Sequence, residues 1–185
     1  MFQTIAQNET TKVWAAYDPN APEIGEIFYC VELAAFVKAV RYHYTDAGVV
    51  ATADRTVKKF AFLATDDSAA ILAGLSKRAV ASDQAVITTD TTGGNAVGGD
   101  GKHIGMGTLL GTPTAALPVC YIQISGYPEF TAGSSSIVAG DFLIPDTTEN
   151  GDMTENDGTA GDVYGQAQEN VADNATGTFK LRNCM

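Results

Sequence analysis

Residues that could carry out catalysis are few in this sequence, and they lie far apart. The two histidines have different surroundings, His43 in a run of β-forming residues and His103 in a glycine-rich segment. No serine stands in the GxSxG pattern that exposes a nucleophile on a sharp turn. Lys102 follows glycines as in a phosphate-binding loop, but Ala96 replaces the first glycine and His103 replaces the Ser or Thr. We therefore expect no enzymatic activity, no catalytic residue and no cofactor.

Carboxylates are the one reactive group that the sequence supplies in excess. Residues 141–173 hold nine Asp and Glu and neither Lys nor Arg. A pair of carboxylates can hydrolyse a glycosidic bond. Such pairs normally lie in an aromatic-lined cleft, however, and Tyr164 is the only aromatic between Leu143 and Asn174. We therefore interpret this stretch as a solvated acidic surface.

The acidic stretch also contains a partial match to a calcium-binding loop. Counting twelve residues from Asp146 puts Gly151 at the sixth position, where calcium loops turn sharply. Thr148 at the third position and Asp157 at the twelfth differ from the usual ligands, which are Asp or Asn and a bidentate Glu. We expect a flexible acidic turn without a metal, and the sequence leaves calcium binding by residues 146–157 open.

Three cysteines, Cys30, Cys120 and Cys184, are spread along the chain. Their odd number and wide spacing imply no disulfide framework. Neither the cysteines nor the histidines have the spacing of a zinc site. We therefore expect three free thiols in a reducing compartment.

The charge is divided unevenly between two parts of the chain. Residues 1–80 hold nine acids and eight bases, whereas residues 81–185 hold thirteen acids and three bases. The net charge is −11, and such an acidic surface repels phosphate backbones and anionic lipids. We therefore expect the chain to bind neither nucleic acid nor a membrane, since it also lacks an apolar run of about 18 residues.

The elements that must position these residues are predicted to be short strands. Alternation is clearest at 117–125, where Cys120 and Ile122 point to one face of the predicted strand. Residues 93–111 contain eight glycines, which predict a long loop or a bulged hairpin. Residues 31–38 fit a helical stripe as well as a strand, so one short helix is left open there. Further strands are predicted at 12–17, 40–44, 49–51, 57–63, 136–139, 142–144, 163–167 and 178–182.

This pattern predicts a mainly β fold, an antiparallel β-sandwich or small β-barrel with long loops. We expect an N-terminal arm over residues 1–12 and a single domain over residues 13–185. A sub-boundary can be drawn near 81–116, which would set apart a barrel-like C-terminal part over 117–185. Residues 145–162 are expected to bury almost nothing, because nearly all of them are polar or glycine.

Four segments in the last third of the chain follow one another in an order that resembles a known family. Residues 118–126 are similar to the YxWVQxxG strand of phage head decoration proteins, and residues 138–145 to the segment that follows it. Residues 165–169 and 177–182 are similar to the last two strands of that family.

The resemblance implies a capsid cement protein that binds the major capsid protein on the outer surface of a phage head and clamps its subunits. It also implies a homotrimer, synthesis in the bacterial cytoplasm and a final location on the virion exterior. Cys120 and Ile122 replace the more usual aromatics of the family, which leaves the subfamily open. Another virion or host-surface-binding role, in a head fibre or a tail, is the alternative interpretation.

The nearly neutral N-terminal part is the expected side for contact with the capsid or with another copy. Its arm could add a strand to a neighbouring sheet. Trp14 and Tyr17 could instead be core residues. The candidate contact residues are Lys12, Trp14, Tyr17, Arg41, Lys58 and Lys59.

Overall fold

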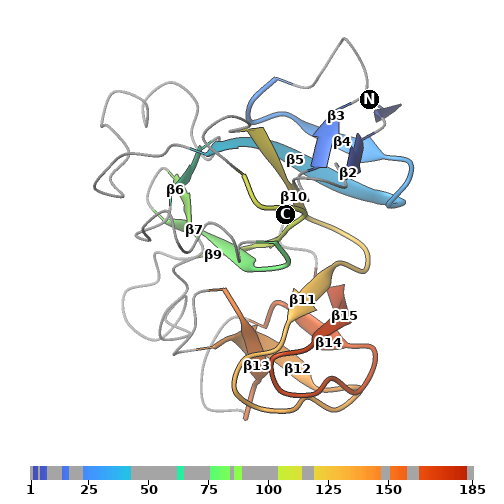
Figure 1. The fold of residues 1–185 in the computed structure, drawn as a ribbon, viewed down its shortest axis with the longest axis vertical. Helices are drawn as coiled ribbons and strands as arrows, with labels where there is room; N and C mark the ends of the chain where they lie inside the picture. The colour runs from blue at the N-terminus through green and yellow to red at the C-terminus, as the bar shows by residue number, and fades with distance from the viewer. Residues whose placement is uncertain are drawn as a thin grey trace.

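The structure is a computed structural model of the 185-residue chain. Every regular element among its described residues is a β-strand, and the strands form two sheets and a separate pair (Figure 1). The prediction of a mainly β, sandwich-like fold is therefore confirmed. The described residues are 2–3, 5–7, 14–16, 23–42, 62–64, 76–83, 86–88, 104–113, 119–146, 151–157 and 163–182.

The larger sheet has eight strands and runs from blue to yellow in Figure 1. In spatial order they are β1 (Phe2–Gln3), β4 (Ile27–Cys30), β5 (Ala35–Tyr42), β10 (Val119–Gln123), β9 (Ile104–Leu109), β7 (Ala79–Asp83), β8 (Val86–Thr88) and β6 (Phe62–Ala64). β6, the last strand in this order, also pairs with β5, the third strand.

Three pairings in the larger sheet are parallel, which adds parallel neighbours to the antiparallel arrangement expected from the sequence. They are β1 with β4, β5 with β6, and β6 with β8. Parallel neighbours need a crossover of about a dozen residues or more, and residues 43–61 supply that length between β5 and β6. Strand-forming composition alone does not reveal which distant strands will meet in this way.

The smaller sheet has five strands and is orange to red in Figure 1. In spatial order they are β11 (Glu129–Thr131), β15 (Thr176–Leu181), β14 (Gly165–Ala167), β12 (Phe142–Pro145) and β13 (Met153–Glu155). Its neighbouring strands all pair antiparallel, and an isolated parallel bridge links Ala132, directly after β11, to Met153 of β13. Separately, β2 (Ile5–Gln7) pairs with β3 (Trp14–Ala16).

Residues 31–38 contain no helix, which corrects the alternative that the sequence left open. Residues 31–34 form a turn, and β5 follows it directly. Strand neighbours on both sides decide this conformation, because Val37 stands opposite Phe28 of β4 and Gln123 of β10. The apolar spacing that suggested a helix is overridden by tertiary pairing.

β10, the strand with the clearest alternation, is buried on both faces. On one face Tyr121 packs edge-to-face against Phe28, with ring centroids 6.0 Å apart. On the other face Cys120 and Ile122 are also buried. Alternation therefore marks which residues share a face of β10, but it does not mark one face as exposed, since both faces of this strand are covered.

The glycine-rich segment contains β9, so the bulged strand of the expected hairpin is found at residues 104–109, and residues 93–103 lie outside the described residues. The register between β7 and β9 shifts between Val80 and Ala81, as it does at a β-bulge. Gly107 has a φ of +141°, and a Cβ there would overlap the carbonyl oxygen of Gln123 on the neighbouring β10. Glycine is therefore required at this close approach of two strands.

Each sheet has its own buried apolar cluster. In the larger sheet the cluster is centred on Phe28 and Tyr121. In the smaller sheet Phe130 and Phe179 pack edge-to-face, with ring centroids 5.7 Å apart. Ala79 of β7 belongs to this second cluster, so the larger sheet contributes a residue to the core of the smaller one.

The acidic segment 145–162 includes β13 and contacts the larger sheet, which corrects the prediction that it buries almost nothing. Asp152 is only 1% exposed and forms an ion pair with Arg78. The Gly151 carbonyl accepts a hydrogen bond from the N–H of Ala79 at 2.6 Å. These polar groups can be buried because the larger sheet provides their partners.

Candidate functional site

Arg41 is the one predicted contact residue whose side chain is described. It is exposed on β5, opposite Val119 of β10. Trp14 lies in β3, where the structure describes its strand pairing only. Lys12, Tyr17, Lys58 and Lys59 lie outside the described residues. A contact surface formed by these six residues therefore stays a prediction.

The described part of the candidate calcium segment is held by protein contacts. Asp146 and Asp152 are buried, and Asp152 is paired with the guanidinium of Arg78. Asp157 is exposed, and residues 147–150 are outside the described ranges. Across the described residues, no three or more His, Cys, Asp or Glu side chains gather in a way that could hold a metal ion.

Two of the three predicted free thiols are described, and neither is in a disulfide, while the Cys30 thiol donates a hydrogen bond to the carboxylate of Glu32 at 3.4 Å. Cys30 and Cys120 are buried, on β4 and β10 respectively. Burial raises the pKa of the Cys120 thiol far above its ordinary value, because the thiolate would lose its hydration. A nucleophilic role for Cys120 is therefore disfavoured in the folded protein. Cys184 lies outside the described residues.

An apolar hollow of about 440 Å³ lies at β12, β14 and β15 of the smaller sheet. A row of three residues crosses the sheet at this point: Phe142 stands opposite Gln166, and Gln166 stands opposite Lys180. Their neighbours Leu143 and Phe179 are buried in the core, so the row belongs to the outer face. The hollow is therefore a feature of the sheet surface, and Gly165 and Leu181 are the buried residues in its lining.

Backbone hydrogen bonds beyond the strand ends fix one side of the hollow. The N–H of Tyr164 donates to the carbonyl of Leu143 at 2.9 Å. The N–H of Arg182 donates to the carbonyl of Tyr164 at 2.7 Å. These bonds hold Val163 and Arg182 beside the row, and both residues line the hollow. The lining is thus held by main-chain pairing as well as by side-chain packing.

Most of the positive charge in the acidic part of the chain lies at this hollow. Between residues 81 and 185 the sequence has only Lys102, Lys180 and Arg182 as bases. Lys180 and Arg182 both line the hollow, and the side chain of Phe142 beside them is 55% exposed. Sequence reasoning missed this site. The two-residue spacing of the bases in a predicted strand, which puts both on one face, was the available signal.

A second exposed apolar surface lies on the hairpin of β4 and β5. Tyr29 and Phe36 stand opposite each other and pack edge-to-face, with ring centroids 5.4 Å apart. Ile27 and Val31 are exposed nearby, whereas Lys38, opposite Ile27, is buried. This surface is thus apolar, and it differs from the hollow because its nearest lysine on the hairpin is not at the surface.

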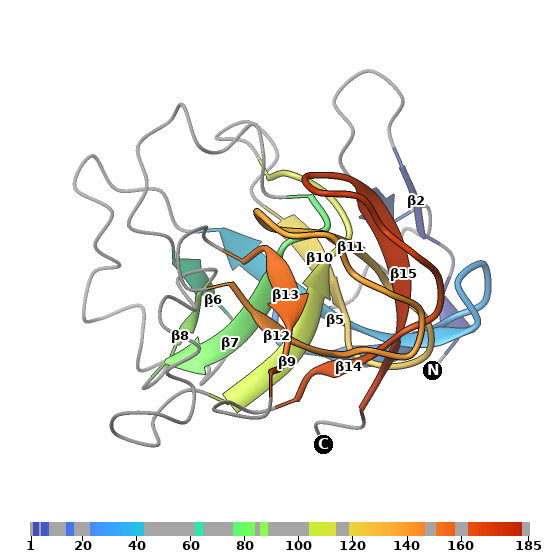
Figure 2. The ribbon, with the colours of Figure 1, turned by 90° about the horizontal axis from the view of Figure 1, so that it is seen from below.

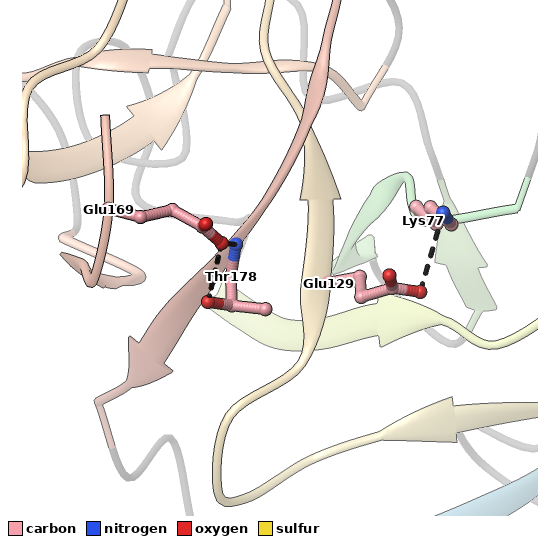
Figure 3. A network of polar contacts seen from close by, with 4 residues as sticks. All are labelled: Lys77, Glu129, Glu169 and Thr178. Atoms are coloured by element: carbon pink, nitrogen blue, oxygen red, sulfur yellow. Dashed lines mark hydrogen bonds and ion pairs between the residues drawn. The ribbon is translucent and has the colours of Figure 1, made fainter. Parts of the chain in front are cut away.

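Two polar contacts involve β15 and β11, the strands on the far side of the smaller sheet from β12 and β13 (Figure 3). The carboxylate of Glu169 accepts hydrogen bonds from the N–H and the hydroxyl of Thr178, both at 2.9 Å. Lys77, in the turn before β7, forms an ion pair with Glu129 of β11 at 3.4 Å. Because it is solvent-exposed, the ion pair is worth at most about 1 kcal/mol. It nevertheless links the two sheets at β11.

The chain matches no family model and no curated protein. Searched over its described residues, the structure contains no helix suited to crossing a membrane. Function must therefore be inferred from the residues and surfaces of the chain itself.

Proposed function

We propose that this chain is a structural virion protein, a cement protein that binds the outer surface of a phage capsid. It clamps neighbouring subunits of the major capsid protein and so stabilises the head against the pressure of the packaged DNA. In this proposal it acts as a homotrimer, and it uses no cofactor and no catalytic residue.

The observation that supports the proposal most is where the four segments that resemble decoration proteins lie. Residues 138–145, 165–169 and 177–182 include β12, β14 and β15, which are consecutive neighbours in the smaller sheet (Figure 1). Residues 118–126 include β10, which is in the larger sheet. Three of the four segments therefore build one sheet together, as a shared domain of that family requires, and this arrangement supports the resemblance.

Exposed apolar side chains on both sheets also favour a protein that works by binding other proteins. Large apolar residues are normally buried, and a group of them at the surface often marks a contact site. Phe142 and Val138 are exposed on the smaller sheet and its loop, and Phe36 and Val31 on the larger. Capsid subunits, or further copies of the chain, could cover these positions.

The proposal is tested by removing the gene for this chain from the phage that encodes it. Heads without the chain are expected to release their DNA at a lower temperature than complete heads. They are also expected to release it after a smaller drop in salt concentration. Addition of the purified chain should restore their resistance, and the same amount of heat-denatured chain serves as the control. Heads of unchanged stability would contradict the cement role. Defective adsorption with unchanged heads would instead support the fibre or tail alternative.

A further inference from the structure

We propose that the hollow on the smaller sheet is a capsid-contact site and that it receives an apolar side chain lying next to a carboxylate. The occupant would be an exposed segment of the major capsid protein. This inference rests on the proposed function and adds to it a specific surface and the chemistry of the partner.

The shape of the hollow suits part of a protein chain. Its volume of about 440 Å³ lies within the range of roughly 300–1,000 Å³ typical of binding sites. Phe142, Val163 and Leu181 supply apolar lining, and only Leu181 among them is buried in the core. Covering the exposed ring of Phe142 with an apolar side chain would remove both groups from water, which is the main driving force for such contacts.

The charge of the hollow favours a carboxylate beside that apolar side chain. Lys180 and Arg182 line it, and the segment 141–173 of the same chain is strongly acidic. The two cations attract an anionic group at the hollow, whereas the acidic residues around them repel anions from the rest of this part of the protein. A partner would thus be selected by a single well-placed carboxylate, which also fixes its register on the sheet.

The homotrimer of the proposed function needs a surface for self-contact as well as a surface for the capsid. The β4–β5 hairpin offers its apolar surface to another copy without involving the hollow. We therefore assign the hollow to the capsid protein and leave self-association to other surfaces.

The test measures binding of purified chain to heads that lack it, by co-sedimentation over a range of chain concentrations. Phe142→Ala should weaken binding about tenfold or more, as expected when a central aromatic contact is truncated. Lys180→Glu should weaken it by a similar factor, and Lys180→Arg should bind almost as well as the wild type. Higher salt should weaken wild-type binding more than that of Lys180→Glu, since screening acts on the rim charge.

Tyr127→Ala is the matched control, because Tyr127 is an exposed aromatic residue that does not line the hollow. Thermal unfolding of each variant checks that the fold is intact, and Lys180→Glu alters only an exposed side chain. Wild-type binding with no loss in Phe142→Ala and Lys180→Glu would overturn this inference alone. Absence of wild-type binding would overturn the proposed function as well. A change in oligomeric state, without a change in capsid binding, would identify a second copy as the occupant and overturn the inference.

Discussion

The two sheets of this protein are built in different ways from the same chain. The smaller sheet uses strands between residues 129 and 181, and each strand pairs antiparallel with the strands next to it. The larger sheet collects strands from residues 2 to 123 and includes three parallel pairings. Figure 1 and Figure 2 show the smaller sheet lying beside β7 and β9 of the larger one. Local pairing therefore defines one sheet, and pairing across long connections defines the other.

The two sheets also differ in the surfaces that they expose. The smaller sheet carries an apolar hollow with two cations in an acidic region, whereas the larger sheet carries an apolar aromatic pair. The sheets nevertheless share a core residue, Ala79, and an ion pair between Arg78 and the buried Asp152. We therefore expect the two surfaces to differ in partner and the two sheets to unfold together.

The largest expected effect comes from truncating a core aromatic in each sheet. Phe130→Ala and Phe28→Ala should each lower the free energy of unfolding by about 3–5 kcal/mol, because each removes a buried ring and leaves a cavity. Urea unfolding followed by circular dichroism and by tyrosine fluorescence measures this loss. If the sheets are coupled, both signals shift together in both variants. A second transition in either variant would show that the sheets are independent.

The next effect tests the ion pair that joins the sheets. Arg78→Met should destabilise the protein by about 3 kcal/mol or more, because it leaves the buried carboxylate of Asp152 without a cation. Adding Asp152→Asn should recover part of the loss, since the neutral amide is easier to bury. Urea midpoints of the wild type and of these two variants measure this coupling. Equal midpoints for wild type and Arg78→Met would contradict an ion pair between the sheets.

A smaller effect compares close backbone contacts in the two sheets. Gly107→Ala in the larger sheet and Gly165→Ala in the smaller one should each cost about 1–3 kcal/mol, because the added Cβ overlaps a backbone carbonyl oxygen. The comparison variant is Gly140→Ala, whose Cβ would meet nothing within 4 Å and would cost only the strain of a φ of +99°. Thermal melting should rank Gly140→Ala as the mildest. A larger loss in Gly140→Ala would reject the close-contact explanation.

The smallest effect is a pH dependence located in the larger sheet. Burial lowers the pKa of Lys38 from its ordinary value of 10.5, so the unfolded chain binds this proton more tightly than the folded one. The free energy of unfolding should therefore rise as the pH increases towards 10.5. Lys38→Met should be slightly more stable than the wild type at neutral pH, and this advantage should shrink as the pH rises. A constant difference between melting temperatures across pH 7–10 would contradict the assignment.

Most strands of the smaller sheet could be predicted from sequence, and the reason is their local pairing. Phe142, Gly165 and Thr178 each lie in a strand that alternation and turn residues had indicated. β13 was missed because its core residue, Met153, is surrounded by acids that normally indicate a solvated turn. The burial of Asp152 depends on Arg78, which lies 74 positions earlier, and no local pattern could reveal that partner.

The hollow was harder to predict than the strands around it. It requires Phe142, Gln166 and Lys180 to share a row, and the register between their strands decides that arrangement. A shift of one residue in either pairing would put one of these side chains on the opposite face of the sheet, because successive side chains of a strand point to opposite faces. Parallel pairings such as β5 with β6 were missed for a related reason, since their connection is long and has no sequence signature of its own.

The most direct test of the proposed cement role is the copy number of this chain in purified particles of its phage, relative to the major capsid protein. Quantitative mass spectrometry of particles purified away from free protein gives this ratio. A ratio near one to one is what a protein that clamps capsid subunits over the whole head requires. A handful of copies per particle, or none, would contradict the cement role and would point to a fibre, a tail or a protein outside the virion.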